Sequence, residues 1–119
     1  MSNFNLTGLR RWLATLMSPR GSALSMYRSG MTKARRRDYA GAIADYSTAI
    51  DAEHIPIDVK AMAIYNRALA YAATHEDAKA ADDLAAMLSM PGLPENITTQ
   101  ARQRRERIRR RLGNTDASE

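Results

Sequence analysis

Few side chains in this sequence have the chemistry of a catalytic or metal-binding group. The candidates are two histidines and two pairs of adjacent carboxylates: His54, His75, Glu76, Asp77, Asp82 and Asp83. The histidines fall in different predicted links between helices, and neither has a second ligand at metal-binding spacing. The carboxylate pairs lie near an expected helix start, where the helix dipole favours negative charge, and acid–base catalysis would require burial. We therefore expect no enzyme activity, no metal site and no cofactor.

The composition limits the size of the fold and separates the charges along the chain. With 119 residues, 45% of them hydrophobic and none of them cysteine, the chain can form one domain with a modest core and no disulfide. Residues 1–37 carry eight basic and no acidic side chains, residues 38–95 three basic and ten acidic ones, and residues 96–119 seven basic and three acidic ones. Such alternation can join neighbouring segments or present basic surfaces to an acidic partner.

The last basic block, RQRRERIRRRL over residues 102–112, contains seven arginines and one glutamate. Neutralising phosphate groups requires only such positive charge, so binding of nucleic acid or of an anionic membrane surface is an alternative function. No aromatic side chain is interleaved for base stacking, and exposed arginines can equally pair with the acidic middle of the chain. We therefore prefer protein binding to nucleic-acid binding.

The N-terminal block is amphipathic over residues 4–17. At helical spacing its apolar side chains share one face: Leu6, Leu9, Leu13, Leu16 and Met17. This composition is typical of an organelle transit peptide or of a helix in contact with a membrane surface, and a helix docked on its own domain is a third interpretation. No apolar run approaches the roughly 20 residues that span a bilayer, and none resembles a secretory signal. We expect a soluble protein of the cytoplasm or of an organelle matrix.

Hydrophobic periodicity predicts helix over nearly the whole chain, so the expected fold class is all-α. Proline and glycine within residues 18–22 are expected to separate an N-terminal region, 1–22, from the first helix of the domain. The expected helices then cover residues 23–36, 39–52, 58–73 and 74–90, with a last helix that begins at Pro94 or Asn96 and ends at Leu112.

Polar residues mark several of the expected helix ends. Asp38 and Asp58 are predicted N-caps, and Thr74 followed by Asp77 resembles a capping box with Asp in place of the usual Glu. Gly113 suits the position just after a helix, so residues 114–119 are predicted to form a disordered tail.

Two stretches of the chain repeat one pattern of small side chains. Gly30 and Ala42 have the same separation along the chain as Ala68 and Ala80. In each unit the first small residue lies on one helix and the second on the next, where two antiparallel helices would cross. Only small side chains allow so close an approach, and the pattern therefore predicts two helix-turn-helix units.

The pattern resembles the tetratricopeptide repeat, a helix-turn-helix unit of about 34 residues. The matching residues are Gly30, Ala42, Tyr46 and Ala49 in the first unit and Ala68, Tyr71, Ala80 and Leu84 in the second. The resemblance covers residues 23–91 as two degenerate units, about 23–52 and 58–90, and the link between them is longer than is usual in the family. Because two repeats are fewer than stability usually requires, we expect the Arg-rich helix over 92–113 to cap one end of the stack. The amphipathic N-terminal segment or a second copy of the chain would cover the other end.

The resemblance implies an adaptor or scaffold module, because first helices of successive repeats in this family line a concave groove for a peptide or helix. Tyrosine and methionine side chains would form an adaptable apolar floor, and two arginines could pair with carboxylates, so a protein or peptide of acidic-amphipathic character fits best. Ordinary core packing, or cover by the N-terminal amphipathic helix, is the alternative role for the tyrosines and methionines. Carried over by repeat position, the groove residues are Leu24, Tyr27, Arg28, Met31, Arg35, Met62, Tyr65, Asn66 and Leu69.

Overall fold

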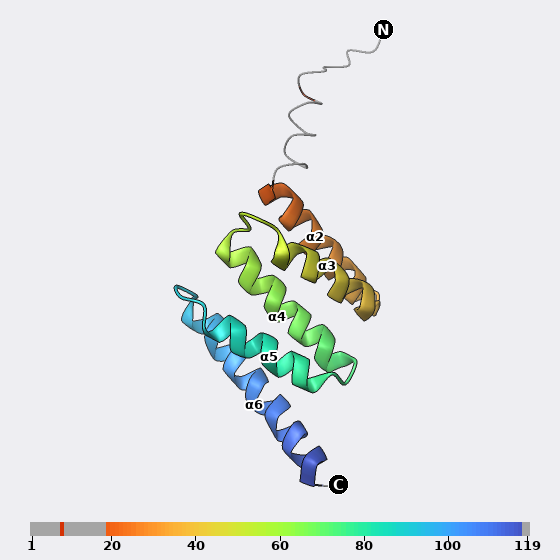
Figure 1. Ribbon diagram of the computed structural model, residues 1–119, viewed down its shortest axis with the longest axis vertical. Coiled ribbons are helices and arrows are strands. Elements are labelled where there is room, and N and C mark those ends of the chain that lie inside the picture. Colours follow the sequence, from red (N-terminus) through yellow and green to blue (C-terminus); the bar gives the residue numbers. More distant parts are fainter. Residues whose placement is uncertain (1–7, 9–18, 118–119) are drawn as a thin grey trace.

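The computed structural model describes residue 8 and residues 19–117 of the chain. Over these residues the protein is all-helical and has no strand, as predicted (Figure 1). The helices are α2 (Pro19–Arg35), α3 (Tyr39–Asp51), α4 (Ile57–Ala73), α5 (Asp77–Leu88) and α6 (Glu95–Ala117). Within this described part, none of the helices combines the length and the apolar character needed to cross a membrane. The predictions for residues 4–17 fall outside the described residues, apart from Gly8.

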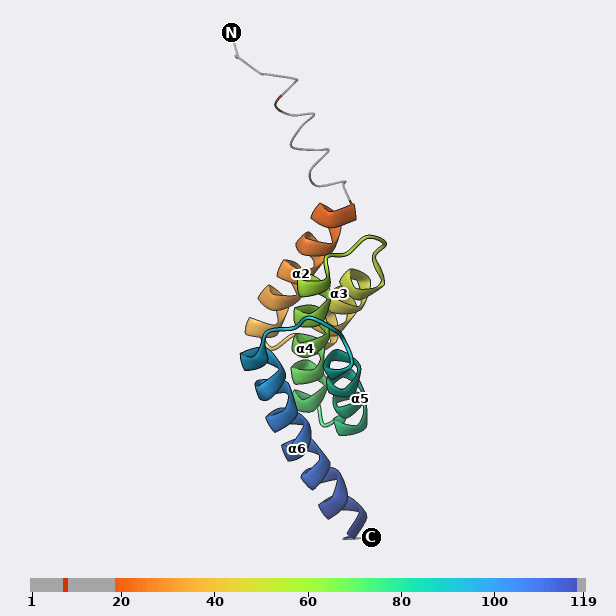
Figure 2. The same cartoon turned by 90° about the vertical axis from the view of Figure 1, so that its left-hand side faces the viewer.

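The helices pack as two antiparallel pairs followed by one further helix. α2 packs against α3 and α4 packs against α5, while α3 also contacts α4 and α5 also contacts α6. Figure 2 shows α2, α4 and α6 along one side of the stack and α3 and α5 along the other. Each second helix therefore lies between two first helices, which gives the fold its repeat-like form.

Equivalent helices follow one another with a constant spacing along the chain. The first helices α2, α4 and α6 begin at Pro19, Ile57 and Glu95, so the two steps between their starts are equal. The second helices α3 and α5 begin at Tyr39 and Asp77, which are separated by the same step. We call this step the unit period. α6 therefore occupies the register of the first helix of a third unit, whereas the sequence predicted only a capping helix.

Small side chains fill the places where paired helices cross. Ala42, Ala68 and Ala80 are completely buried, and Ala68 and Ala80 belong to one buried cluster. Gly30 is also buried, and a Cβ atom added to it would lie 2.6 Å from Cε1 of Tyr46. The close approach of α2 and α3 thus depends on the absence of a side chain at Gly30.

The turns inside the two helix pairs have the same hydrogen-bonding pattern. After α2, the N–H of Asp38 donates to the C=O of Lys33 at 2.9 Å, and the N–H of Arg37 donates to the C=O of Ala34 at 3.0 Å. The residues around His75 repeat both bonds after α4. These are Schellman motifs, whose left-handed position usually holds glycine but here holds Arg37 and His75, each with a φ of 63°.

We expect Arg37→Gly and His75→Gly each to stabilise the fold by about 0.5–1 kcal/mol. Glycine adopts a positive φ without the steric cost that other L-residues meet there, and this gain exceeds the added flexibility of the unfolded chain. Thermal unfolding followed by circular dichroism measures the effect. Ala44→Gly, in the exposed middle of α3, is the control and should destabilise by about 0.5–1 kcal/mol. A lower melting temperature for both turn variants would contradict the prediction.

The predicted starts of α2 and α4 differ from those in the structure, and the predicted start of α3 is confirmed. α2 begins at Pro19, ahead of the expected start at Ala23, because proline lacks an N–H and suits the first helical turn. The prediction for Asp38 is confirmed, since its Oδ1 accepts a hydrogen bond from the N–H of Gly41 at 3.0 Å. The N-cap of α4 is Pro56, and Asp58 instead lies in the first turn of that helix.

The predictions for the capping box and for the C-terminal tail are wrong. Thr74 is the C-cap of α4, and its hydroxyl donates to the C=O of Ala70 at 3.2 Å, while Glu76 is the N-cap of α5. α6 continues through Gly113 to Ala117, so residues 114–117 are helical rather than disordered. Glycine lowers helix stability but does not by itself end a helix.

Candidate functional site

Tyr27 and Asn66, two of the predicted groove residues, connect α2 to α4. Nδ2 of Asn66 donates a hydrogen bond to the hydroxyl oxygen of Tyr27 at 3.0 Å. The ring of Tyr27 also lies 6.1 Å from that of Tyr46, measured between centroids. Burial raises the pKa of Tyr27, and the hydrogen bond from Asn66 offsets part of that rise. This pair holds two neighbouring first helices together and aligns the side chains beside it.

The other predicted groove residues fall into two exposure classes. The apolar and aromatic ones are half-buried, which leaves part of each side chain accessible: Leu24, Met31, Met62, Tyr65 and Leu69. Arg28 and Arg35 are exposed. The predicted residues therefore present a partly accessible apolar surface with arginines on its α2 side.

Two adjoining hollows lie between α4 and α6. The first has a volume of about 390 Å³ and is lined by Leu69, Ala72, Ala73, Arg104, Arg107, Ile108 and Arg111. The second, of about 210 Å³, is lined by Tyr65, Gln100, Gln103, Arg104 and Arg107. Because Arg104 and Arg107 line both, we treat the hollows as one surface. We call it the α4–α6 groove and define it by Tyr65, Leu69, Ala72, Arg104 and Arg107.

The contribution of α6 to this groove was not predicted from the sequence. The Arg-rich helix was expected to cap the stack, and the expected groove residues came from the first two units only. One unit period carries Tyr65, Asn66 and Leu69 onto Gln103, Arg104 and Arg107. All three of the latter line the α4–α6 groove, so the period was a signal that could have identified them.

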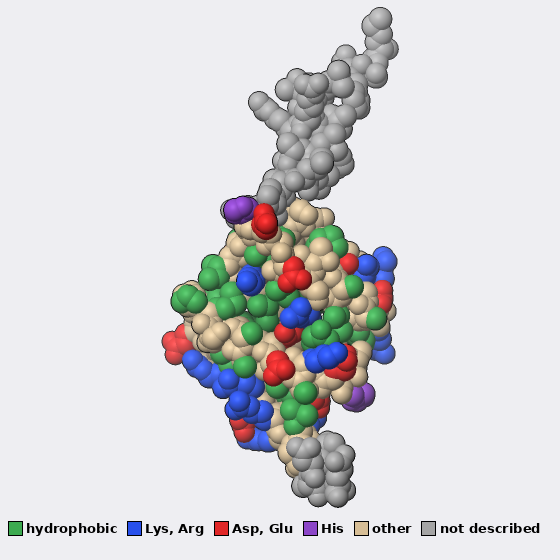
Figure 3. Space-filling view, viewed as in Figure 1, with side chains coloured by type: hydrophobic (Ala, Val, Ile, Leu, Met, Phe, Trp, Pro, Cys, Tyr) green, Lys and Arg blue, Asp and Glu red, His purple; other side chains and the backbone are tan. Residues whose placement is uncertain are grey.

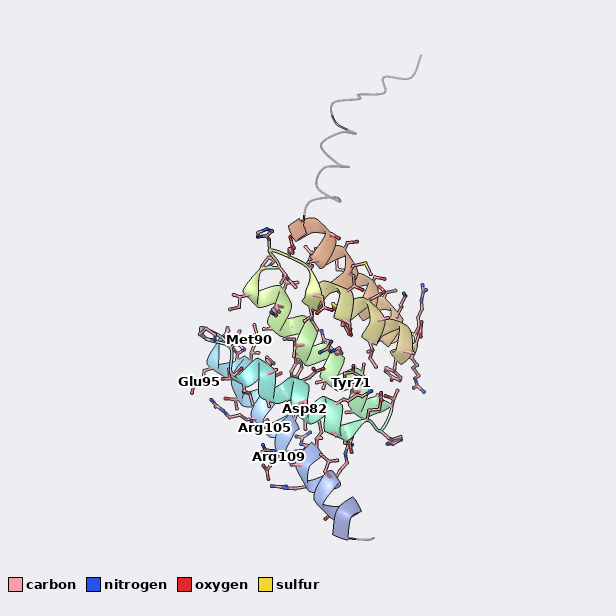
Figure 4. All side chains as sticks on the ribbon, viewed as in Figure 1. Tyr71, Asp82, Met90, Glu95, Arg105 and Arg109 are labelled. Carbon is pink, nitrogen blue, oxygen red and sulfur yellow. The ribbon has the colours of Figure 1, made fainter. Side chains whose placement is uncertain are left out.

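The arginines of α6 differ in their partners. Nη2 of Arg111 lies 2.8 Å from Oδ1 of Asp77, and Nε of Arg110 lies 3.6 Å from Oε1 of Glu106. Figure 3 shows Lys and Arg side chains gathered at the lower left, over α6, and Figure 4 labels two of them on that helix, Arg105 and Arg109. Within the described residues, five arginines of α6 have no acidic partner: Arg102, Arg104, Arg105, Arg107 and Arg109. The α6 side of the groove is therefore positively charged.

A buried carboxylate occupies the same position in each unit, which the sequence analysis did not foresee. Asp83 lies one unit period after Asp45, and each is only 7% exposed. Asp45 accepts a hydrogen bond from Oγ of Ser29 at 2.6 Å and pairs with Nζ of Lys33 at 2.9 Å. Burial by itself raises the pKa of Asp45, but the bonds from Ser29 and Lys33 and the charge of Lys33 outweigh it. The pKa of Asp45 therefore lies below its ordinary value.

In the second unit, Arg67 of α4 binds the equivalent carboxylate. Its Nε and Nη2 donate to Oδ2 and Oδ1 of Asp83 at 2.9 and 2.7 Å, which is a bidentate arrangement. Its Nη1 donates to Oγ of Ser47 on α3 at 3.0 Å, and its guanidinium carbon lies 5.8 Å from the ring centroid of Tyr71. One side chain thus joins α3, α4 and α5 directly behind the groove-lining face of α4.

The two histidines considered for catalysis lie far apart. His54 lies in the turn before α4 and His75 in the turn after it, so a helix of 17 residues, about 25 Å long, separates them. Both histidines are exposed. Asp77 and Asp83 are engaged by Arg111 and Arg67. These pairs stabilise the fold and do not form a common site.

The fold and the surface together define an all-α, repeat-like protein with a groove between its first helices. Comparison of the chain with models of known protein families, with curated proteins and with solved structures found no match. The resemblance to the tetratricopeptide repeat therefore stays a prediction from the sequence pattern.

Proposed function

We propose that this protein is an interaction module of the tetratricopeptide type, which binds a peptide or helix of another protein and acts as an adaptor or scaffold. The observation that supports this proposal is the α4–α6 groove. There Leu69 and Ala72 remain half-buried beside open volume, whereas Ala68, which packs in the core on the same helix, is completely covered. Partly covered apolar side chains next to convergent polar groups are typical of binding surfaces.

The chemistry of the groove also suits a polypeptide. The ring of Tyr65 and the side chain of Leu69 offer apolar contact, and the arginines and glutamines of α6 offer hydrogen-bond donors along the same surface. Aromatic and arginine side chains contribute a large share of the binding free energy at protein interfaces. A peptide bound along the groove would therefore cover the apolar surface and also accept hydrogen bonds from the arginines and glutamines of α6.

The test is an affinity selection from a random peptide library on the immobilised full chain. Peptides selected in this way should lose about tenfold or more in affinity when Tyr65→Ala and Leu69→Ala are combined, because truncating central contacts commonly costs more than about 1 kcal/mol each. Ile57→Ala, at an exposed apolar residue outside the groove, is the matched control and should leave affinity unchanged. Retention of affinity by the double variant, with its circular dichroism spectrum intact, would contradict the proposal.

A second candidate function is binding of nucleic acid or of an anionic membrane surface. It is favoured by one observation, that Arg102 and Arg109 are exposed, without an acidic partner among the described residues, and outside both hollows of the groove. Such binding would weaken steeply with added salt. If neither RNA nor anionic vesicles bind near physiological ionic strength, this candidate fails.

A further inference from the structure

We infer that the ligand of this surface is an extended segment of a partner protein with acidic residues on both sides of an apolar centre. The apolar residues would lie over α4, and the carboxylates would pair with arginines of α2 on one side and of α6 on the other. This inference rests on the proposed function and specifies the chemistry of the partner.

The arrangement of charge across the three first helices supports this inference. On α2 the predicted groove residues include two arginines, Arg28 and Arg35, and both are exposed. On α6 the corresponding face contains Arg104, which is equivalent to Arg28, and Arg107, which is equivalent to Met31, and both line the hollows. Arg111, the equivalent of Arg35, also lines the first hollow but is paired with Asp77. Between them, α4 presents no charge at these positions, only Met62, Tyr65, Asn66, Leu69 and Ala73. The surface is therefore basic at both edges and apolar in the middle.

The arginines at both edges lack carboxylate partners within the described part of the chain. Arg28, Arg104 and Arg107 make no ion pair there, and Nη2 of Arg35 donates only to Oγ1 of Thr32, at 3.3 Å. By contrast, Arg67 on the α5 side of α4 and Arg111 at the end of the first hollow are paired with aspartates. Carboxylates of a ligand would give the edge arginines short, charge-assisted hydrogen bonds.

The spacing of the helices sets the spacing of the acidic residues. Packed helices lie about 8–10 Å apart, and the hollows between α4 and α6 widen the second step, so the path from α2 across α4 to α6 covers at least roughly 20 Å. An extended chain advances about 3.3 Å per residue, so carboxylates about six residues apart would reach both edges. The intervening side chains on one face would then lie over Tyr65 and Leu69.

The N-terminal segment of the chain is a poor candidate for the same position. Residues 1–18 contain Arg10 and Arg11 and no acidic residue. Placing these arginines beside those of α2 and α6 would bring like charges together, which is unfavourable. The charge pattern instead favours an acidic partner.

Binding of synthetic peptides to the full chain tests the inference by fluorescence anisotropy. The probe is a fluorescein-labelled peptide with glutamates at both ends, about six residues apart, and leucines between them. Three matched peptides replace the glutamates by serine, replace them by lysine, or retain them at one end only. We expect the first probe to bind most tightly, and its affinity to fall as salt is added.

Variants at each edge separate the two halves of the inference. Arg104→Ala with Arg107→Ala, and separately Arg28→Ala with Arg35→Ala, should each weaken the glutamate probe by about three- to tenfold. Arg102→Ala with Arg109→Ala removes the same charge from α6 outside the groove and should have little effect. An effect at α6 alone would overturn the two-sided arrangement.

The remaining outcomes also decide the question. If the serine peptide binds as tightly as the glutamate probe and loses affinity with Leu69→Ala, the inference fails while the proposed function stands. If the glutamate probe does not bind, the inference fails, and the library selection still tests the proposed function.

If a poly(U) RNA binds more tightly than the probe, and all three double-arginine variants weaken RNA binding equally, the surface recognises a polyanion and the inference is wrong. Sedimentation of the free chain detects a second copy as occupant, which would also overturn it.

Discussion

Arg67→Met is expected to destabilise the protein by about 3–5 kcal/mol, because it leaves the carboxylate of Asp83 buried without its bidentate partner. The side chain of Asp83 is only 10% exposed, so water replaces little of the lost interaction. The substitution also removes the hydrogen bond to Ser47, which is one of the links between the two units. Since domains of this size unfold with only about 5–15 kcal/mol, much of the stability would be lost. Urea unfolding followed by circular dichroism measures the change.

Lys33→Met is the matched control in the first unit. The side chain of Lys33 is 40% exposed, and Asp45 would keep its bond from Ser29, so solvent and the hydroxyl can replace the lost charge. We expect a loss of about 1 kcal/mol or less. Replacing both members of the second pair, Arg67→Met with Asp83→Leu, should recover most of the stability, because no charge is then left buried. Equal losses for Lys33→Met and Arg67→Met would contradict this account.

Gly30→Ala is expected to destabilise the protein by about 1–3 kcal/mol, although alanine is the better helix former. The new Cβ would lie 2.6 Å from the ring of Tyr46, a distance that real contacts do not reach. That ring is 2% exposed and packs on Tyr27, so it has no free space into which to move. Chemical unfolding of the variant gives the magnitude.

In the second unit, a smaller side chain in place of the tyrosine leaves room for alanine in place of the glycine. Ala68 and Leu84 occupy the positions of Gly30 and Tyr46 one unit period later, and both are completely buried. In a Tyr46→Leu background, Gly30→Ala should therefore cost nothing or stabilise by about 0.5–1 kcal/mol, the usual gain from replacing glycine in a helix. The double-mutant cycle isolates this coupling. Additive effects of the two substitutions would show that the ring does not set the requirement for glycine.

Local and periodic signals predicted much of the fold. The apolar periodicity of Ala42, Tyr46 and Ala49 predicted a helix, and its buried face contains all three. Asp38 followed by an apolar pattern predicted the start of that helix, because a capping bond depends only on neighbouring residues. The prediction that Thr74 caps the start of α5 was wrong. A threonine hydroxyl can bond to the end of the preceding helix as well as to the start of the next, and here it bonds to the end of α4.

The candidate site was less predictable, because it depends on contacts between distant parts of the chain. The pairing of Arg67 with Asp83 is not evident from composition, since both are ordinary surface residue types. The unit period places Asp83 over Asp45 and Arg67 over Ser29, but a serine hydroxyl and an arginine differ in type, and the second partner of Asp45, Lys33, has no basic counterpart. The groove role of Arg104 and Arg107 follows only when α6 is given the same register as α4.

The equal steps between the starts of the first helices make whole units interchangeable. Among the described helices, the main contacts lie within one unit or between neighbouring units. A tandem copy of residues 57–94 inserted after Pro94 would then extend the stack by one module without disturbing the others. Gene duplication or engineering could lengthen the protein in the same increments, and every insertion would add one helix to the face formed by α2, α4 and α6.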